Sequence, residues 1–125
     1  MPLKINSLKD AFYGSKILKV ENLDLLDTKN IKNMSSVFEN ALNFNQDLSK
    51  WNTENVTDMC AMFKDAIKFN QDLDKWETSS LANINQMFLN TTSFNGNITT
   101  WDVSKVKSLY NTFADAVSFN QDVSN

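Results

Sequence analysis

The sequence contains no histidine and no arginine, and each absence argues against a class of function. Without histidine, the chain lacks the commonest general base, the Ser-His-Asp triad and most catalytic zinc sites. All twelve basic residues are lysines and the net charge is −3. The chain therefore has neither the guanidinium groups that read bases nor a basic surface for phosphates. We expect neither an enzyme nor a nucleic-acid-binding protein.

Cysteine, glycine and proline are also scarce. The single cysteine, Cys60, cannot form an internal disulfide, and it has no histidine or second cysteine to activate it. We interpret it as a partly exposed thiol without a catalytic role. Gly14 and Gly96 are the only glycines, so the chain has no glycine-rich loop for a phosphate or a nucleotide. We expect no cofactor.

Long hydrophobic runs are missing as well. No segment approaches the roughly 18 apolar residues that a membrane-spanning helix needs. Residues 1–6 lack the apolar core of a signal peptide, which leaves a cytoplasmic location open. We expect no membrane insertion.

What the sequence does contain is a repeat of 25 residues. The segment Phe44–Asn52 returns as Phe69–Glu77, as Phe94–Asp102 and, shortened, as Phe119–Asn125. A fixed period of this length is typical of a solenoid, in which one unit stacks on itself. The period predicts two parts: a degenerate N-terminal capping repeat at 1–30, and one continuous domain at 31–125 with three regular repeats and the start of a fourth.

Aligned repeats show a helix-like pattern followed by a strand-like one. Met34, Val37, Phe38 and Ala41 have the i, i+3, i+4, i+7 spacing of a short helix. The segment after the second phenylalanine alternates polar and apolar residues, as a strand does. The residue before each expected helix is of a type that favours the N-cap: Asn33, Asp58, Asn83 and Ser108.

Two phenylalanine columns should form the core. The core ladder comprises Phe38, Phe63, Phe88 and Phe113 together with Phe44, Phe69, Phe94 and Phe119. The sequence therefore predicts an α/β repeat fold: a short right-handed solenoid with one strand and one short helix per 25-residue repeat.

Three columns on the expected strand face are candidates for binding. They comprise amides and carboxylates with neighbouring lysines, and the tryptophans: Asn45, Asn70 and Asn95; Asp47, Asp72 and Asn97 with Lys50 and Lys75; and Trp51, Trp76 and Trp101. Each column also has a structural interpretation. The amides would satisfy backbone groups of adjoining turns, the lysines would neutralise the carboxylates, and the indoles would close the core.

The alternatives are specific. Stacked carboxylates could hold a hard cation such as Ca²⁺, but the glycine-rich calcium repeat is absent and we expect no metal site. Stacked indoles could offer a platform for sugar rings or partner side chains. The amide column could recognise a ligand.

The residues resemble a known bacterial repeat. Residues 59–81 read Met-x-x-Met-Phe-x-x-Ala-x-x-Phe-Asn-Gln-Asp-Leu-x-x-Trp-x-x-x-x-Leu. This string resembles the repeat of BspA-like bacterial surface proteins, which is abundant in mycoplasmas. The resemblance covers Asn33–Asn125 well and Met1–Lys32 loosely. It implies a leucine-rich-repeat-like solenoid at the cell surface or in secreted proteins, where it mediates adhesion or other protein contacts.

Two functions follow as hypotheses. The first is a non-enzymatic module of a surface or secreted protein that contacts a protein or another host or extracellular macromolecule through its strand face. The second is a structural spacer or self-associating solenoid with no specific ligand. In the second case the uncapped C-terminal repeat would pair end to end with another copy.

Overall fold

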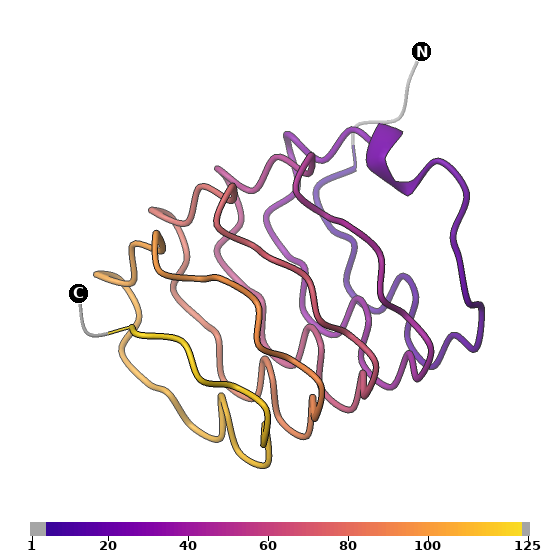
Figure 1. The fold of residues 1–125 in the computed structure, drawn as a ribbon. Coiled ribbons are helices and arrows are strands. Elements are labelled where there is room, and N and C mark those ends of the chain that lie inside the picture. The colour runs from indigo at the N-terminus through magenta and orange to yellow at the C-terminus, as the bar shows by residue number, and fades with distance from the viewer. Residues whose placement is uncertain (1–4, 124–125) are drawn as a thin grey trace.

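The chain winds into a stack of similar turns, shown in Figure 1 from indigo at the first to yellow at the last. The computed structural model describes residues 5–123. We call each circuit a coil; the five coils are 5–30, 31–55, 56–80, 81–105 and 106–123. The outermost residues of the two predicted parts, 1–4 and 124–125, lie outside the described residues.

Regular secondary structure is almost absent from residues 5–123. The one helix there is a short 3₁₀ helix, η1, at Leu23–Leu25. Backbone pairing of the β type is limited in this range to three isolated parallel bridges, Ser7–Asn33, Asn33–Asp58 and Asp58–Asn83. The predicted α/β solenoid with one strand and one helix per repeat is therefore wrong, and so is its likeness to a leucine-rich repeat. No helix in the described part of the chain has the length and apolar character to cross a membrane.

Left-handed residues explain why the helix-like pattern forms no helix. Ser36 and Asn40 have φ angles of 57° and 59°, and the other coils carry positive φ at matching positions. An α-helix of L-residues does not accommodate such residues, and its N–H groups bond within the helix. Here the N–H groups of Ser36 and Phe38 donate to carbonyls of the next coil, at 2.9 Å each. The apolar spacing instead reflects consecutive tight turns, such as the one closed by the Ala41 N–H on the Phe38 carbonyl at 3.0 Å.

The four expected helix caps therefore cap no helix. In each of them a side-chain oxygen accepts the backbone N–H two residues later, which is the geometry of an Asx or Ser/Thr turn. The donor–acceptor distances are 2.8 Å at Asn33, 2.8 Å at Asp58, 3.0 Å at Asn83 and 3.2 Å at Ser108.

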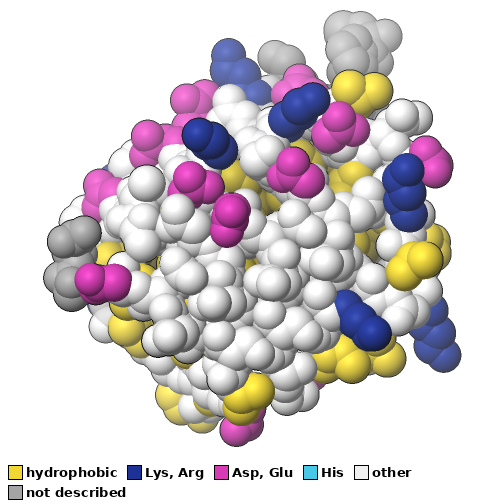
Figure 2. All heavy atoms as spheres, in the orientation of Figure 1, with side chains coloured by type: hydrophobic (Ala, Val, Ile, Leu, Met, Phe, Trp, Pro, Cys, Tyr) yellow, Lys and Arg dark blue, Asp and Glu magenta, His cyan; other side chains and the backbone are white. Residues whose placement is uncertain are grey.

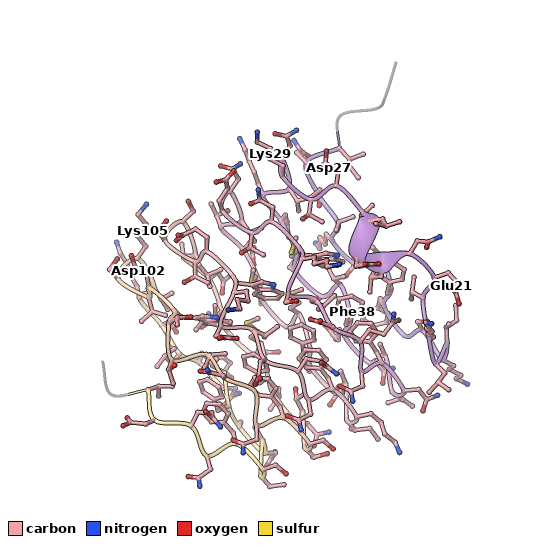
Figure 3. The ribbon with its side chains drawn as sticks, turned by 45° about the horizontal axis from the view of Figure 1, so that its top comes forward. Glu21, Asp27, Lys29, Phe38, Asp102 and Lys105 are labelled. Carbon is pink, nitrogen blue, oxygen red and sulfur yellow. The ribbon has the colours of Figure 1, made fainter. Side chains whose placement is uncertain are left out.

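Stacked rings fill the interior. Phe63 lies 5.7 Å from Phe38 on one side and 5.7 Å from Phe88 on the other, with nearly parallel planes. Within its coil it also stacks on Phe69, at 4.0 Å. Figure 3 shows Phe38 inside the stack. The rings of Phe38, Phe44, Phe63, Phe69, Phe88 and Phe94 are buried, whereas Phe113 and Phe119 of the last coil are half-buried. The aromatic columns thus run from coil to coil and are covered least at the end of the stack.

Candidate binding face

A ladder of asparagines joins the coils where a strand was expected. The N–H of Asn70 donates to the Oδ1 atom of Asn45, that of Asn95 to Asn70, and that of Asn120 to Asn95, each at 2.8 Å. A parallel β-ladder would use backbone carbonyls for these bonds. The side-chain acceptors explain why this segment is not a strand, although its residues stack in register.

Glutamines next to the ladder add further hydrogen bonds to it. The Nε2 atom of Gln71 donates to the carbonyl and to the Oδ1 atom of Asn45, at 3.1 and 2.9 Å. Gln121 bonds Asn95 in the same way, at 3.1 and 3.0 Å. Gly96 occupies the matching position in the fourth coil, where a Cβ atom would overlap the Gln71 carbonyl oxygen. Glycine is therefore required at this one step of the ladder.

We call the exposed asparagines of this ladder, Asn45, Asn70, Asn95 and Asn120, the amide face. The yellow segment of the last coil runs across the side of the stack turned toward the viewer in Figure 1, and Figure 2 shows the same side. Figure 2 shows charged side chains along the upper margin of that side, with mostly uncharged side chains and backbone below them. Polar but uncharged groups thus dominate the middle of this surface.

The tryptophans do not belong to this surface. Trp51 and Trp76 are 2% and 3% exposed, and Trp101 is half-buried. Each indole Nε1 donates to the carbonyl of a residue in the preceding coil, at 2.9–3.0 Å. Trp51 and Trp76 are therefore core residues, as the structural interpretation of this column has it, and the alternative of an indole platform for sugars or partner side chains does not apply to them.

The carboxylate column is bonded to the backbone. Asp47 Oδ1 accepts the Ser49 N–H and Asp72 Oδ1 accepts the Asn97 N–H, at 2.8 Å each. The hydrogen bonds from Ser49, first its N–H and then its hydroxyl, hold the pKa of Asp47 below its usual range. No cluster of three or more possible metal ligands occurs in residues 5–123.

The lysines of this column lie at the margin. Lys50 forms an ion pair with Asp24 at 3.7 Å, and both side chains are largely exposed, so the pair adds little to stability. Lys75 is exposed and lines a shallow hollow with Asp72 and Asp74. Neither lysine forms an ion pair with Asp47 or Asp72 in the described structure, although the charge of Lys50 contributes to the lowered pKa of Asp47.

Two further columns were not singled out from the sequence. Buried threonines link neighbouring coils: the Thr53 hydroxyl donates to the Glu77 carbonyl, and the Thr78 hydroxyl accepts the Asp102 N–H, both at 2.8 Å. The signal for them was visible, because Thr28, Thr53 and Thr78 recur at the same 25-residue spacing.

The second of these columns lies on the outer corner of the coils. Its members are Asp27, Asn52, Glu77 and Asp102, and each accepts the N–H two residues later at 2.9–3.0 Å. Figure 3 shows Asp27 and Asp102 projecting from the stack, near Lys29 and Lys105. Hydrogen bonds from Ser79 and Ser104 lower the pKa of Glu77 and Asp102, respectively. The side chains of this column therefore stabilise turns.

The thiol of Cys60 is half-buried. Burial is the main cause that raises its pKa, and the charges of Asp58 and Glu39 raise it further. A thiol with a raised pKa is a weaker nucleophile at neutral pH because less of it is thiolate.

The comparisons with known proteins identify a family. Residues 6–125 match the family described as "Mycoplasma protein of unknown function, DUF285". Neither the curated proteins nor the solved structures contain a match. The match supports the mycoplasma-type assignment suggested by the repeat but gives no support to a BspA-like leucine-rich repeat. The chain belongs to the Mycoplasma protein family of unknown function DUF285.

Proposed function

We propose that the chain is a non-enzymatic interaction module that contacts a protein through its amide face. The observation that carries this proposal is the regular ladder from Asn45 to Asn120, in which the side chains of Asn45, Asn70 and Asn95 are exposed and yet accept hydrogen bonds from the backbone. Side chains that are already fixed lose little conformational entropy when a partner binds. Such a surface is preorganised for binding.

The ladder leaves one half of each amide available. The Oδ1 atoms of Asn45, Asn70 and Asn95 accept hydrogen bonds within the stack, while their Nδ2 groups donate to no other described residue. These donors repeat once per coil along the stack. An extended polypeptide offers a row of carbonyl acceptors, which makes a protein segment a suitable partner.

The composition supports a binding role over catalysis, since the chain has no histidine and its thiol has a raised pKa. The resemblance to BspA-like surface repeats favours a surface or secreted setting. We include that location in the proposal.

The test uses a charge change that preserves the ladder. In the triple variant N45D/N70D/N95D each side chain keeps an oxygen acceptor for the next coil but replaces its Nδ2 donor with a carboxylate oxygen. The matched control N30D/A82D/S118D adds the same charge at exposed positions outside the ladder. Thermal melting of both variants checks that they fold.

Binding would be measured on arrays of extracellular proteins and glycans, followed by titration of each hit. We expect a protein hit whose affinity falls at least about tenfold in the ladder variant and is retained in the control. Equal binding by all three proteins would refute the amide face, and hits confined to glycans would refute the protein partner.

A second candidate function is self-association, and the distribution of exposed apolar residues favours it. All the exposed large hydrophobic residues except Leu42 and Ile67 lie at 5–26 or 103–123, at the two ends of the stack. The N–H groups of Leu109, Asn111 and Phe113 donate to no described residue. Equally, no described residue donates to the carbonyls of Ser7, Lys9 and Ala11 in the first coil.

These two rows are complementary, so the last coil of one copy could stack on the first coil of another. Sedimentation velocity over a concentration series tests this. A monomer at all concentrations would refute self-association without affecting the amide-face proposal.

A further inference from the structure

One step of the asparagine ladder differs chemically from the others. Asn95 is followed by Gly96, whereas Asn45, Asn70 and Asn120 are each followed by glutamine. Asparagine is among the chemically labile side chains of proteins. It reacts most readily when a glycine follows it, because no Cβ atom hinders the approach of the next backbone nitrogen. Asn95 is therefore the ladder residue most open to spontaneous modification.

Packing requires the glycine at this step. A Cβ atom at position 96 would overlap the Gln71 carbonyl oxygen and would lie 2.7 Å from Cε1 of Phe94. Gly96 is buried, and its N–H donates to no described residue. The backbone nitrogen next to Asn95 is therefore not held by a hydrogen bond.

The fifth coil holds the side chain of Asn95. Its Oδ1 atom accepts the Asn120 N–H at 2.8 Å and the Gln121 Nε2 group at 3.0 Å. The same Nε2 group donates to the backbone carbonyl of Asn95 at 3.1 Å. The side chain is exposed, and its Nδ2 group donates to no described residue. The amide nitrogen thus faces water while the amide oxygen is bonded to the next coil.

We infer that Asn95 is a site of spontaneous deamidation and that the fifth coil controls its rate. The Gly96 nitrogen loses its proton to hydroxide and attacks Cγ of Asn95. A C–N bond forms, and the Nδ2 group takes a proton from water and leaves as ammonia. Water then opens the resulting succinimide at Cγ to give aspartate, or at the backbone carbonyl carbon to give isoaspartate. The net reaction consumes one water molecule and releases one ammonia.

Ring closure requires the side chain to move. Cγ has to come within bonding distance of the Gly96 nitrogen, which takes Oδ1 away from its two donors. The buried N–H of Gly96 must also become accessible to base. Both conditions are met when the fifth coil separates locally from the fourth, so the reaction proceeds through local opening.

The two products affect the stack differently. Aspartate keeps an oxygen acceptor for the Asn120 N–H and adds a negative charge to the ladder. Isoaspartate lengthens the main chain by one carbon atom, whereas the bonds from Asn70 to Asn95 and from Asn95 to Asn120 depend on coils of equal length. The isoaspartate form should therefore melt at a lower temperature than N95D. The inference does not depend on what the amide face binds.

The experiment incubates the full chain at mildly alkaline pH and follows every asparagine by peptide mapping with mass spectrometry. Asn95 should convert in the folded chain while Asn45 does not. Asn45 is an internal control, because its Oδ1 accepts the matching donors from Asn70 and Gln71 but Gln46 follows it. In urea Asn95 should convert at least about tenfold faster, since the reaction no longer waits for local opening.

Two variants test the role of the fifth coil. Q121A removes one donor from Asn95 and should speed its conversion about 2- to 10-fold, as expected for the loss of a neutral hydrogen bond. Q71A removes the matching donor from Asn45 and should leave the rate at Asn95 unchanged. Circular dichroism before incubation checks that both variants are folded.

Four outcomes would overturn the inference. They are the absence of conversion at Asn95 in a folded chain incubated many times longer than the unfolded chain needs, comparable conversion at Asn45, Asn70 or Asn120, equal rates at Asn95 in the folded and unfolded chains, and equal rates in Q121A and Q71A.

Discussion

The asparagine ladder predicts a graded loss of stability when its members are changed to alanine. Asn45 Oδ1 accepts two hydrogen bonds, from the Asn70 N–H at 2.8 Å and from the Gln71 Nε2 at 2.9 Å. Asn70 Oδ1 accepts one, from the Asn95 N–H at 2.8 Å, and Asn120 Oδ1 accepts none from the described residues. N45A should therefore destabilise the fold most, N70A less and N120A least.

The magnitude follows from the number of bonds. A neutral hydrogen bond contributes about 0.5–1.5 kcal/mol net, so N70A should lower the unfolding free energy by about 1 kcal/mol and N45A by about 1–2 kcal/mol. Because these side chains are exposed, water replaces part of each lost bond, which places both effects toward the lower end. N120A should change it by less than about 0.5 kcal/mol, as surface substitutions usually do.

Urea unfolding followed by tryptophan fluorescence measures this order, since Trp51 and Trp76 are buried in the folded chain. N70D is the matched control because it keeps an oxygen acceptor for the Asn95 N–H, and it should unfold near the wild-type midpoint. If N120A destabilised as much as N45A, or N70D as much as N70A, the ladder would not be the source of the stability.

Three further predictions follow from single positions. G96A should destabilise by about 1–3 kcal/mol, because its Cβ atom would overlap the Gln71 carbonyl and the coil must shift; an unchanged urea midpoint would contradict this. In the folded chain the pKa of Asp47 is lowered from 3.8, mainly by the Ser49 N–H. The contribution of Asp47 to stability is therefore complete above the pKa of the unfolded chain, and it is lost as the pH falls through the pKa of the folded chain. D47N should accordingly lose less stability than the wild type between about pH 5 and pH 2, measured as urea midpoints against pH. Burial raises the pKa of Cys60, so iodoacetamide should alkylate the folded chain more slowly at neutral pH than the urea-unfolded chain; equal rates would show an accessible, ordinary thiol.

The fold class could not be taken from the apolar spacing because two structures share it. Met34, Val37, Phe38 and Ala41 match one face of a helix, but they also match residues that flank consecutive tight turns and point inward. A distinguishing signal was present in one column, where Gly14, Asn40, Asp65, Asn90 and Asp115 are all residue types that tolerate positive φ. The other left-handed column, at Asp10, Ser36, Ala61, Gln86 and Asn111, has no such composition. Neighbouring coils hold it there through their hydrogen bonds, which no local pattern reveals.

The candidate site was predictable in register but not in exposure. The 25-residue period shows which residues share a column, and the structure stacks Asn70 on Asn45 and Phe63 on Phe38 accordingly. The period does not show which columns face the interior. The tryptophans turn inward because each indole N–H finds a carbonyl in the preceding coil, a bond between residues 28 positions apart. That partner depends on how the coil closes, which composition and spacing do not determine.

The flank and the ends of the stack offer different chemistry for one physical reason. An inner coil is covered on both sides, so its apolar columns are buried and its flank exposes amides whose oxygens are already bonded. A terminal coil is covered on one side only and exposes residues such as Leu18 and Leu109, at 75% and 62%. Each added coil would lengthen the amide face by one asparagine, whereas the stack would still have two ends. Affinity for a partner on the flank should therefore increase with the number of coils through repeated contacts, whereas affinity at the end should not depend on it.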